Sequence, residues 1–139
     1  MKVAIYSGVI PSTTFIENLI KVIPNHGVVV LLFGYKKSKK EYRNQNIHVF
    51  YQPKNTFLIV LFVLFNILLL GLSSPFKFYQ LIKYYFNFGE KNLYACIHWF
   101  KRVLPVVINL PDIFHIQWGK DLSKWFFLNE LFNVKIILS

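Results

Sequence analysis

The chain alternates between short apolar runs and longer segments in which apolar residues recur at helical spacing. Several of the short runs are rich in Val, Ile and Leu and are bounded by Gly, Pro or polar residues, which is typical of strands buried in a parallel sheet. Five strands are predicted on this basis, at residues 2–7, 28–33, 47–51, 113–117 and 134–138.

The segment between the first two strands predicts a helix. Its candidate N-caps are three consecutive hydroxyl residues, 12–14, and Glu17 stands three residues after Thr14, as in a capping box. The helix is expected to end near Val22, ahead of Pro24. A strand, a helix and a parallel strand in succession form a βαβ unit.

Residues 56–72, TFLIVLFVLFNILLLGL, break this pattern, because Asn66 is their only strongly polar interior residue. As a helix they would extend roughly 25 Å, against a hydrocarbon core of about 30 Å. Such a helix has no polar face, so it must be covered by protein or by lipid.

Two more helices are predicted, at residues 76–88 and 92–104. The first carries Lys77 and Gln80 on a polar face, and aromatic residues fill much of the remainder. A cationic, aromatic-rich amphipathic helix is typical of a membrane interface, although the same pattern suits a helix whose aromatic side packs on a protein core.

The apolar run at 56–72 admits three placements: a membrane span, a monotopic helix in one leaflet, or a helix buried in protein. Basic residues flank it on both sides, so the charge bias that orients a span is weak. A single span would also place the first three strands and the strand at 113–117 on opposite sides of the membrane, where they could not share a sheet. Monotopic insertion is therefore favoured.

The stretch at residues 110–121, LPDIFHIQWGKD, predicts a strand that ends in a sharp turn at Gly119, with Asp121 able to cap a following helix. Because strand residues alternate faces, His115 and Gln117 are expected to point the same way. Open α/β sheets bind ligands at the carboxyl ends of their strands. This strand is therefore expected to present side chains to a ligand.

Together these elements predict an α/β fold: a Rossmann-like parallel sheet with flanking helices and an apolar, membrane-associating helical insertion. The domain is expected to span residues 1–139, and the membrane-associating segment residues 56–88. Because the sequence stops directly after the last predicted strand, at Ser139, the domain is expected to be truncated.

The formal net charge of +10 indicates an anionic partner, and the high apolar content favours a lipid surface over nucleic acid. A strand-like segment opens the chain where a signal peptide would stand, so the expected location is the cytoplasmic face of a membrane. The single cysteine and the spacing of the four histidines predict neither a metal site nor another cofactor. Cys96 and His98 are expected to serve packing.

Residues predicted to contact the membrane lie in the basic segment 36–43 and in the two helices that follow it. The basic segment is otherwise an ordinary solvated loop. The predicted membrane-binding residues are Lys36, Lys37, Lys39, Lys40, Phe62, Phe65, Lys77 and Lys83.

The loop from Ser7 to Thr14 feeds a helix N-terminus, where free backbone N–H groups and the helix dipole favour a phosphate. It has neither GxGxxG nor GxxxxGK[ST], so an ordinary capped turn explains it equally well. The candidate substrate-binding residues are Gly8, Thr13, Thr14, His115 and Gln117; no catalytic residue is assigned.

The segments MKVAIYSGVIPSTTFIENLI and LPDIFHIQW, with a second strand ending LFG and a final VKIILS, resemble the N-terminal domain of GT-B glycosyltransferases. The nearest resemblance is to the family 4 retaining enzymes of bacterial polysaccharide and colanic-acid-type biosynthesis. It covers nearly the whole chain and is most specific in PSTTFIENLI and PDIFHIQW, whereas the helices between them match only in character.

The resemblance implies two Rossmann-like domains around a cleft: an N-terminal one that binds acceptor and often touches membrane, and a C-terminal one that binds a nucleotide-sugar. Many relatives have HxH where this chain has His115-Ile116-Gln117. The C-terminal domain and its acidic donor-binding motif are absent from the 139 residues, so this chain alone is expected to be inactive.

The expected function is the acceptor-binding half of a glycosyltransferase that moves a sugar from a nucleotide-sugar to a lipid-linked or polysaccharide acceptor. The donor would be bound by a missing domain or a partner subunit. The alternative is a noncatalytic membrane anchor or scaffold that recruits a separate donor-binding partner. A small integral membrane protein is a third interpretation.

Overall fold

The computed structural model describes residues 1–116 and 122–138, and the chain forms two compact units. One, here called the sheet unit, comprises Met1–Gln52 and Pro111–Ser139. The other, the helical unit, comprises Pro53–Leu110 and is inserted into the first along the chain. The predicted Gln117, Gly119 and Asp121 lie outside the described residues.

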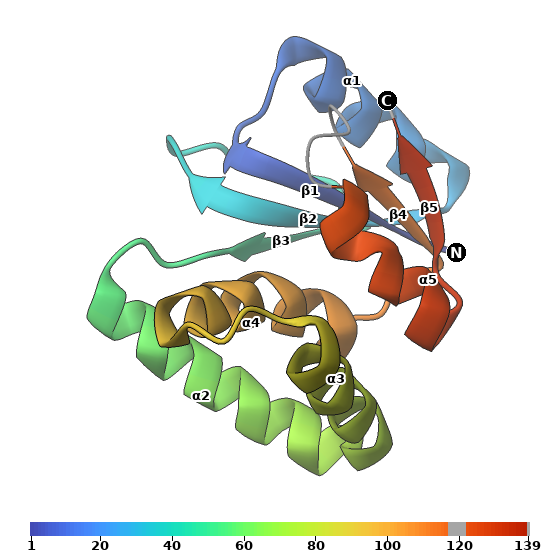
Figure 1. Ribbon diagram of the computed structural model, residues 1–139. Coiled ribbons are helices and arrows are strands. Elements are labelled where there is room, and N and C mark those ends of the chain that lie inside the picture. The colour runs from blue at the N-terminus through green and yellow to red at the C-terminus, as the bar shows by residue number, and fades with distance from the viewer. Residues whose placement is uncertain (117–121, 139) are drawn as a thin grey trace. The chain divides into compact units, whose positions relative to one another are not determined.

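The sheet unit is built on five strands that are all parallel, in the order β3-β2-β1-β4-β5 (Figure 1). This confirms the predicted α/β class with a Rossmann-like parallel sheet. The central strand is β1, which pairs with β2 on one side and with β4 on the other. The strands are β1 (Lys2–Ile10), β2 (Val29–Lys36), β3 (Ile47–Tyr51), β4 (Ile113–Ile116) and β5 (Lys135–Leu138).

Helices cover opposite faces of this sheet. The β1-to-β2 connection contains α1 (Thr14–Val22) and a short 3-10 helix, η1 (Ile23–His26). The β4-to-β5 connection contains η2 (Leu122–Trp125) and α5 (Phe126–Phe132). These two connections leave the centre of the sheet in opposite directions, so the right-handed rule for parallel crossovers places their helices on opposite faces.

The two faces have different cores. On the α1 face, Val3, Ile5, Val30 and Leu32 pack with Ile16 and Ile20 of α1 in a fully aliphatic cluster. On the α5 face, Tyr6, Phe114 and Trp125 form an aromatic cluster with ring centroids 4.5–6.5 Å apart. Alternation along each strand separates the two sets.

The first two strands are longer than predicted, because β1 continues to Ile10 and β2 to Lys36. Their register shifts between Tyr6 and Val9, which marks a bulge in β1. Gly34 lies against this bulge: a Cβ added to it would stand 2.0 Å from the Ser7 carbonyl oxygen. Only glycine allows the two backbones to come this close.

The substitution Gly34→Ala should therefore lower the free energy of unfolding by about 1–3 kcal/mol, because two backbones must separate to admit a methyl group. Gly8→Ala is the matched control, since a Cβ at Gly8 meets no atom within 4 Å. The measurement is urea unfolding of both variants beside the parent chain. Equal stability of the two variants would contradict the close-approach explanation.

The helical unit consists of α2 (Thr56–Ser73), α3 (Pro75–Phe88) and α4 (Leu93–Ile108) (Figure 1). α2 contacts both α3 and α4. The rings of Tyr85, Trp99 and Phe100 hold α3 and α4 together, with centroids 5.0–5.2 Å apart. The predicted helix starts are confirmed within one residue, and two of them have side-chain caps: Asn55 accepts from Phe57 N–H, and Asn92 from Tyr94 N–H.

The predicted end of the third helix was wrong. It was placed at Leu104, but α4 continues through Pro105 to Ile108. A proline within a helix removes one N–H donor. Here the helix continues for three residues beyond Pro105 and ends at Asn109, whose N–H and side-chain amide both donate to the Pro105 carbonyl, at 3.2 and 2.8 Å.

Candidate functional site

The loop from the carboxyl end of β1 to α1 carries three of the predicted substrate-binding residues. Gly8, Thr13 and Thr14 are all exposed there. Thr13 is the N-cap of α1, yet its side chain makes no capping hydrogen bond. The hydroxyls of Thr13 and Thr14 are therefore presented to solvent beside the first turn of a helix, where backbone N–H groups point outward.

Glu17 is buried beneath this loop and holds it in place. Its carboxylate accepts hydrogen bonds from the Ser12 N–H at 2.7 Å and from the Tyr42 hydroxyl at 2.9 Å, and it forms an ion pair with Lys40. The predicted capping box between Thr14 and Glu17 was wrong. The helix begins one residue earlier than that pairing requires, so Glu17 reaches Ser12 and the loop after β2 instead.

These contacts determine the ionisation of Glu17. Burial would raise the pKa of this carboxyl, but the hydrogen bonds from Lys40, Ser12 and Tyr42 outweigh burial and lower its pKa below the ordinary value. Burial and the neighbouring Glu17 charge raise the pKa of Tyr42. Glu17 is therefore an anion, and it ties α1 to residues 40–42.

The lysines of the basic segment 36–43 differ in exposure and in contacts. Lys37 and Lys39 are exposed, whereas Lys40 is half-buried against Glu17 and lies over the ring of Tyr42. Lys36 belongs to β2, and its ammonium lies 5.6 Å from the centroid of the Tyr51 ring. Of the four predicted lysines, Lys37 and Lys39 present their charges most openly.

His115 does not join Gly8, Thr13 and Thr14. It pairs in register with Ile5, on the α1 face of the sheet, and is 9% exposed. It lines an apolar cavity of about 400 Å³ together with Val3, Ile5, Leu19, Ile113 and Ile137. Its Nδ1 has no hydrogen-bond partner among the described residues, and burial lowers the pKa of its imidazole. His115 is thus neutral at pH 7.

Tyr6 and Gln52 form a polar pair on the α5 face of the sheet, toward the carboxyl ends of β1 and β3. The sequence did not suggest this pair. The Tyr6 hydroxyl donates to Gln52 Oε1 at 3.2 Å. Gln52 is buried, and its Nε2 has no partner among the described residues. In the sequence Gln52 is only the residue between a strand and Pro53, so no local pattern distinguishes it.

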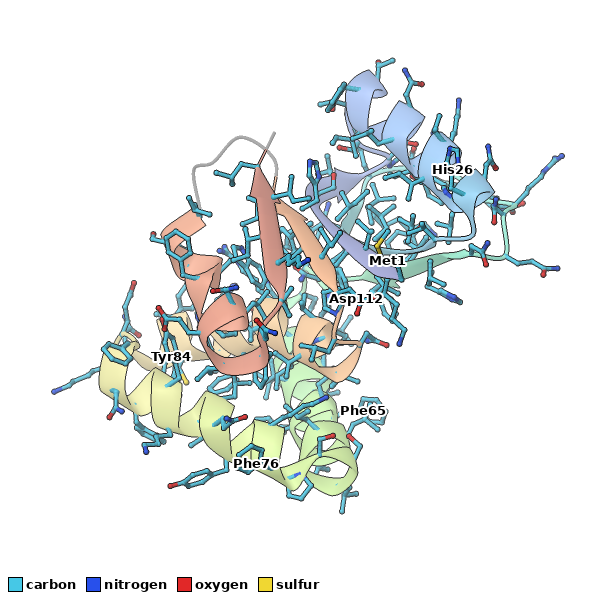
Figure 2. The ribbon with its side chains drawn as sticks, turned by 90° about the vertical axis from the view of Figure 1, so that its right-hand side faces the viewer. Met1, His26, Phe65, Phe76, Tyr84 and Asp112 are labelled. Atoms are coloured by element: carbon cyan, nitrogen blue, oxygen red, sulfur yellow. The ribbon has the colours of Figure 1, made fainter. Side chains whose placement is uncertain are left out.

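The helical unit presents an extensive apolar surface. α2 buries only one stripe, Ile59, Val63, Asn66 and Leu70. Figure 2 labels Phe65 of α2 and Phe76 of α3, which are 64% and 70% exposed. The other large apolar residues exposed on α2 and α3 are Phe57, Leu58, Val60, Leu61, Leu64, Leu68, Leu69, Leu72, Tyr79, Phe86 and Phe88.

The remaining predicted membrane residues differ in exposure. Phe62 and Lys77 are half-buried, whereas Lys83 is exposed. Asn66 is the one polar residue on the buried stripe of α2, and its amide donates to the Phe62 carbonyl at 2.7 Å. That hydrogen bond stays within the helix and satisfies one of the two N–H donors of the amide.

The titratable groups of the described residues make no metal site: no cluster of three or more histidine, cysteine, aspartate or glutamate side chains occurs among them. His98 Nδ1 lies 3.2 Å from the Lys101 ammonium. Burial, together with the charges of Lys101 and Arg102, lowers the pKa of His98.

Comparison of the chain with protein-family models, with curated proteins and with solved structures finds no match.

The substitution Glu17→Gln should lower the free energy of unfolding at pH 7 by about 1–2 kcal/mol, because it weakens charge-assisted hydrogen bonds. Glu17 has a lowered pKa in the folded state, so its contribution is complete above the ordinary carboxyl pKa of about 4.3 and is lost as the pH falls through the folded-state pKa. The difference between parent and variant should thus vanish in acid.

Urea unfolding across a series of pH values measures this difference. Glu41→Gln is the matched control, since Glu41 is an exposed glutamate of the same basic segment. A Glu17→Gln difference that stays unchanged down to the lowest pH at which the chain remains folded would show that packing, rather than the charge, holds the loop.

Proposed function

We propose that this chain is the acceptor-binding, membrane-associated half of a glycosyltransferase of the GT-B type, acting with a separate donor-binding domain or subunit. The observation that carries the proposal is the insertion of an exposed apolar helical unit between β3 and β4 of a parallel Rossmann-like sheet. A sheet of this kind binds ligands at the carboxyl ends of its strands. The inserted helices supply a means of holding the sheet unit at a membrane that carries a lipid-linked acceptor.

The exposed surface of α2 supports membrane association. α2 is long and apolar enough to cross a membrane, yet only 22% of it is buried. A core helix would be mostly buried, and monomeric soluble proteins rarely expose apolar patches larger than a few hundred Å². Burying one such side chain in hydrocarbon contributes about 1.5–3 kcal/mol.

The topology of the sheet supports a monotopic placement over a span. β1 and β4 are neighbours in one sheet, so the chain must return to the side on which it left. If α2 crossed the membrane, then α3, of 14 residues, or α4, of 16 residues, would have to cross it back. These are about 21 and 24 Å long, and they carry Lys77, Lys83, Lys101 and Arg102. Helices of this length and charge suit the interface.

The acceptor would be recognised at the carboxyl end of β1. The exposed hydroxyls of Thr13 and Thr14 can exchange hydrogen bonds with sugar hydroxyls, and Gly8 leaves room for close approach. The buried amide of Gln52, paired with Tyr6, adds an unused donor near the same edge. An anionic lipid headgroup would interact with Lys37 and Lys39, and each lysine would contribute about 1 kcal/mol to the free energy of membrane binding. The nucleotide-sugar would be bound elsewhere.

The second candidate is a noncatalytic anchor that recruits a donor-binding partner to the membrane. One observation favours it: the Glu17 carboxylate already occupies the Ser12 N–H just ahead of α1. That contact weakens the case for a phosphate at this loop. The anchor shares the membrane contacts of the first candidate but predicts no recognition of a sugar.

Membrane binding should fall at least tenfold when two exposed apolar residues of α2 become charged. The variant is Phe65→Glu with Leu68→Glu, and the measurement is cosedimentation with vesicles that contain anionic lipid. The cost of immersing two carboxylates exceeds the 1.4 kcal/mol that a tenfold change requires. Phe15→Glu with Val22→Glu, on exposed positions of α1, is the matched control. Equal loss in both variants would refute a membrane role for α2.

Acceptor binding is tested on the vesicle-bound chain with a polyprenyl-diphosphate-linked sugar as the probe. Thr13→Val with Thr14→Val should weaken binding about tenfold, because each change removes a hydrogen-bonding hydroxyl without changing side-chain size. Thr56→Val, at the first residue of α2, is the control. Equal binding of the same lipid with and without its sugar would favour the anchor.

A further inference from the structure

The α1 face of the sheet is only half covered. α1 packs over β1 and β2, and α5 lies on the opposite face, so among the described residues of the sheet unit no helix packs on the α1 face of β4 and β5. Parallel sheets occur almost only where helices cover both faces. Here Ile113 of β4 is half-buried and Ile137 of β5 is 47% exposed on the uncovered half.

This uncovered half forms the apolar cavity of about 400 Å³ described above. It is bounded on one side by Leu19 and Ile23, and it runs along β1 from Met1 to Ile5. Four residue steps at about 3.3 Å give a groove roughly 13 Å long. At 1.5 Å per residue, this length matches about nine residues of helix, the length of α1 itself.

The groove has one buried polar group, His115, beside Ile5, and basic residues lie at the amino edge of the sheet, where the groove begins at Met1. Among the described residues, His115 Nδ1 has no hydrogen-bond partner, and His115 is nine-tenths buried. His26 and Met1, both labelled in Figure 2, line the groove at the amino edge of the sheet. Lys135 lies at the same edge, paired with Ile113, and Lys21 lies in the last turn of α1. The nearby Asp112 carboxylate is engaged by the Lys2 N–H at 2.6 Å.

This distribution of charge suits the carboxyl end of a helix. A helix that runs antiparallel to the strands, as α1 does, would end at the amino edge, and its negative dipole end would meet Lys21, His26 and Lys135. A polar side chain on its apolar face would satisfy His115 Nδ1. An aliphatic small molecule would fill the groove but would leave the exposed side of β5 uncovered.

We propose that this groove is a docking site for an amphipathic helix of a partner polypeptide, lying antiparallel to the strands between α1 and the exposed face of β5. The proposal does not depend on membrane binding or on sugar recognition. It assigns the sheet unit a protein-binding face distinct from the carboxyl edge.

The probe is a synthetic helical peptide of about four turns, with Leu at positions i, i+3, i+4 and i+7, one Gln on that face and Glu elsewhere. A peptide of the same composition, with its Leu residues spread around the helix, is the comparison. Both are titrated by fluorescence anisotropy into the full chain. The imidazole nitrogen resonances of His115 are followed, with those of His48, exposed on β3, as reference.

The amphipathic peptide should bind at least tenfold more tightly than its comparison and should shift the resonances of His115 but not those of His48. Ile137→Lys should reduce its affinity at least tenfold. Leu138→Lys should not, because Leu138 has nearly the same exposure and alternates to the opposite face of the same strand. Both positions are half-exposed on an edge strand, so both variants are expected to fold.

Three results would overturn the proposal. The first is equal loss of affinity in the two variants. The second is a shift of His115 by decanol and not by the peptide, which would make the groove a site for aliphatic molecules. The third is self-association of the chain that Ile137→Lys abolishes, which would make the occupant a second copy. Vesicle binding of Ile137→Lys, measured separately, should remain that of the parent.

Discussion

The pairing of β1 with β4 is the constraint on which the rest of the structure depends. β1 is the centre of the sheet, and the backbone N–H of Asp112 donates to the Lys2 carbonyl at 3.0 Å just where β4 begins. Everything between β3 and β4 must therefore leave the sheet and return to it. This requirement makes an apolar 18-residue helix an interfacial element in our proposal, although its composition alone would equally suit a span.

The sheet could be predicted because buried parallel strands are continuous apolar runs, which local sequence displays directly. The helix starts at Thr56, Pro75 and Leu93 could be predicted because a capping asparagine or a proline marks each of them. The predictions were wrong at the ends of β1, β2 and α4, which local sequence did not mark. β1 and β2 extend because Gly34 admits the Ser7 carbonyl. α4 continues past Pro105 and ends where Asn109 donates to the Pro105 carbonyl.

The candidate site was harder to predict, because its geometry comes from elements far apart in the sequence. The role of Glu17 depends on Lys40 and Tyr42, which are 23 and 25 residues away. Gln52 matters only because Tyr6 lies opposite it, 46 residues earlier. His115 was expected at a ligand crevice because it lies near a strand end, but strand alternation turns its side chain toward α1. It pairs with Ile5, three residues before Gly8 on β1.

The hydrogen bond from the Lys2 N–H to the Asp112 carboxylate closes a loop of 110 residues, which has a consequence for the order of folding. During synthesis β1, α1, β2 and β3 emerge first, and the helical unit follows, before any residue of β4 exists. Over that interval one side of the central strand is an unpaired parallel edge, the kind of edge that pairs with other chains. Closing so long a loop is slow relative to forming local helices. The nascent chain thus depends on its first βαβ unit, and on prompt burial of its apolar helices, to reach β4 without aggregating.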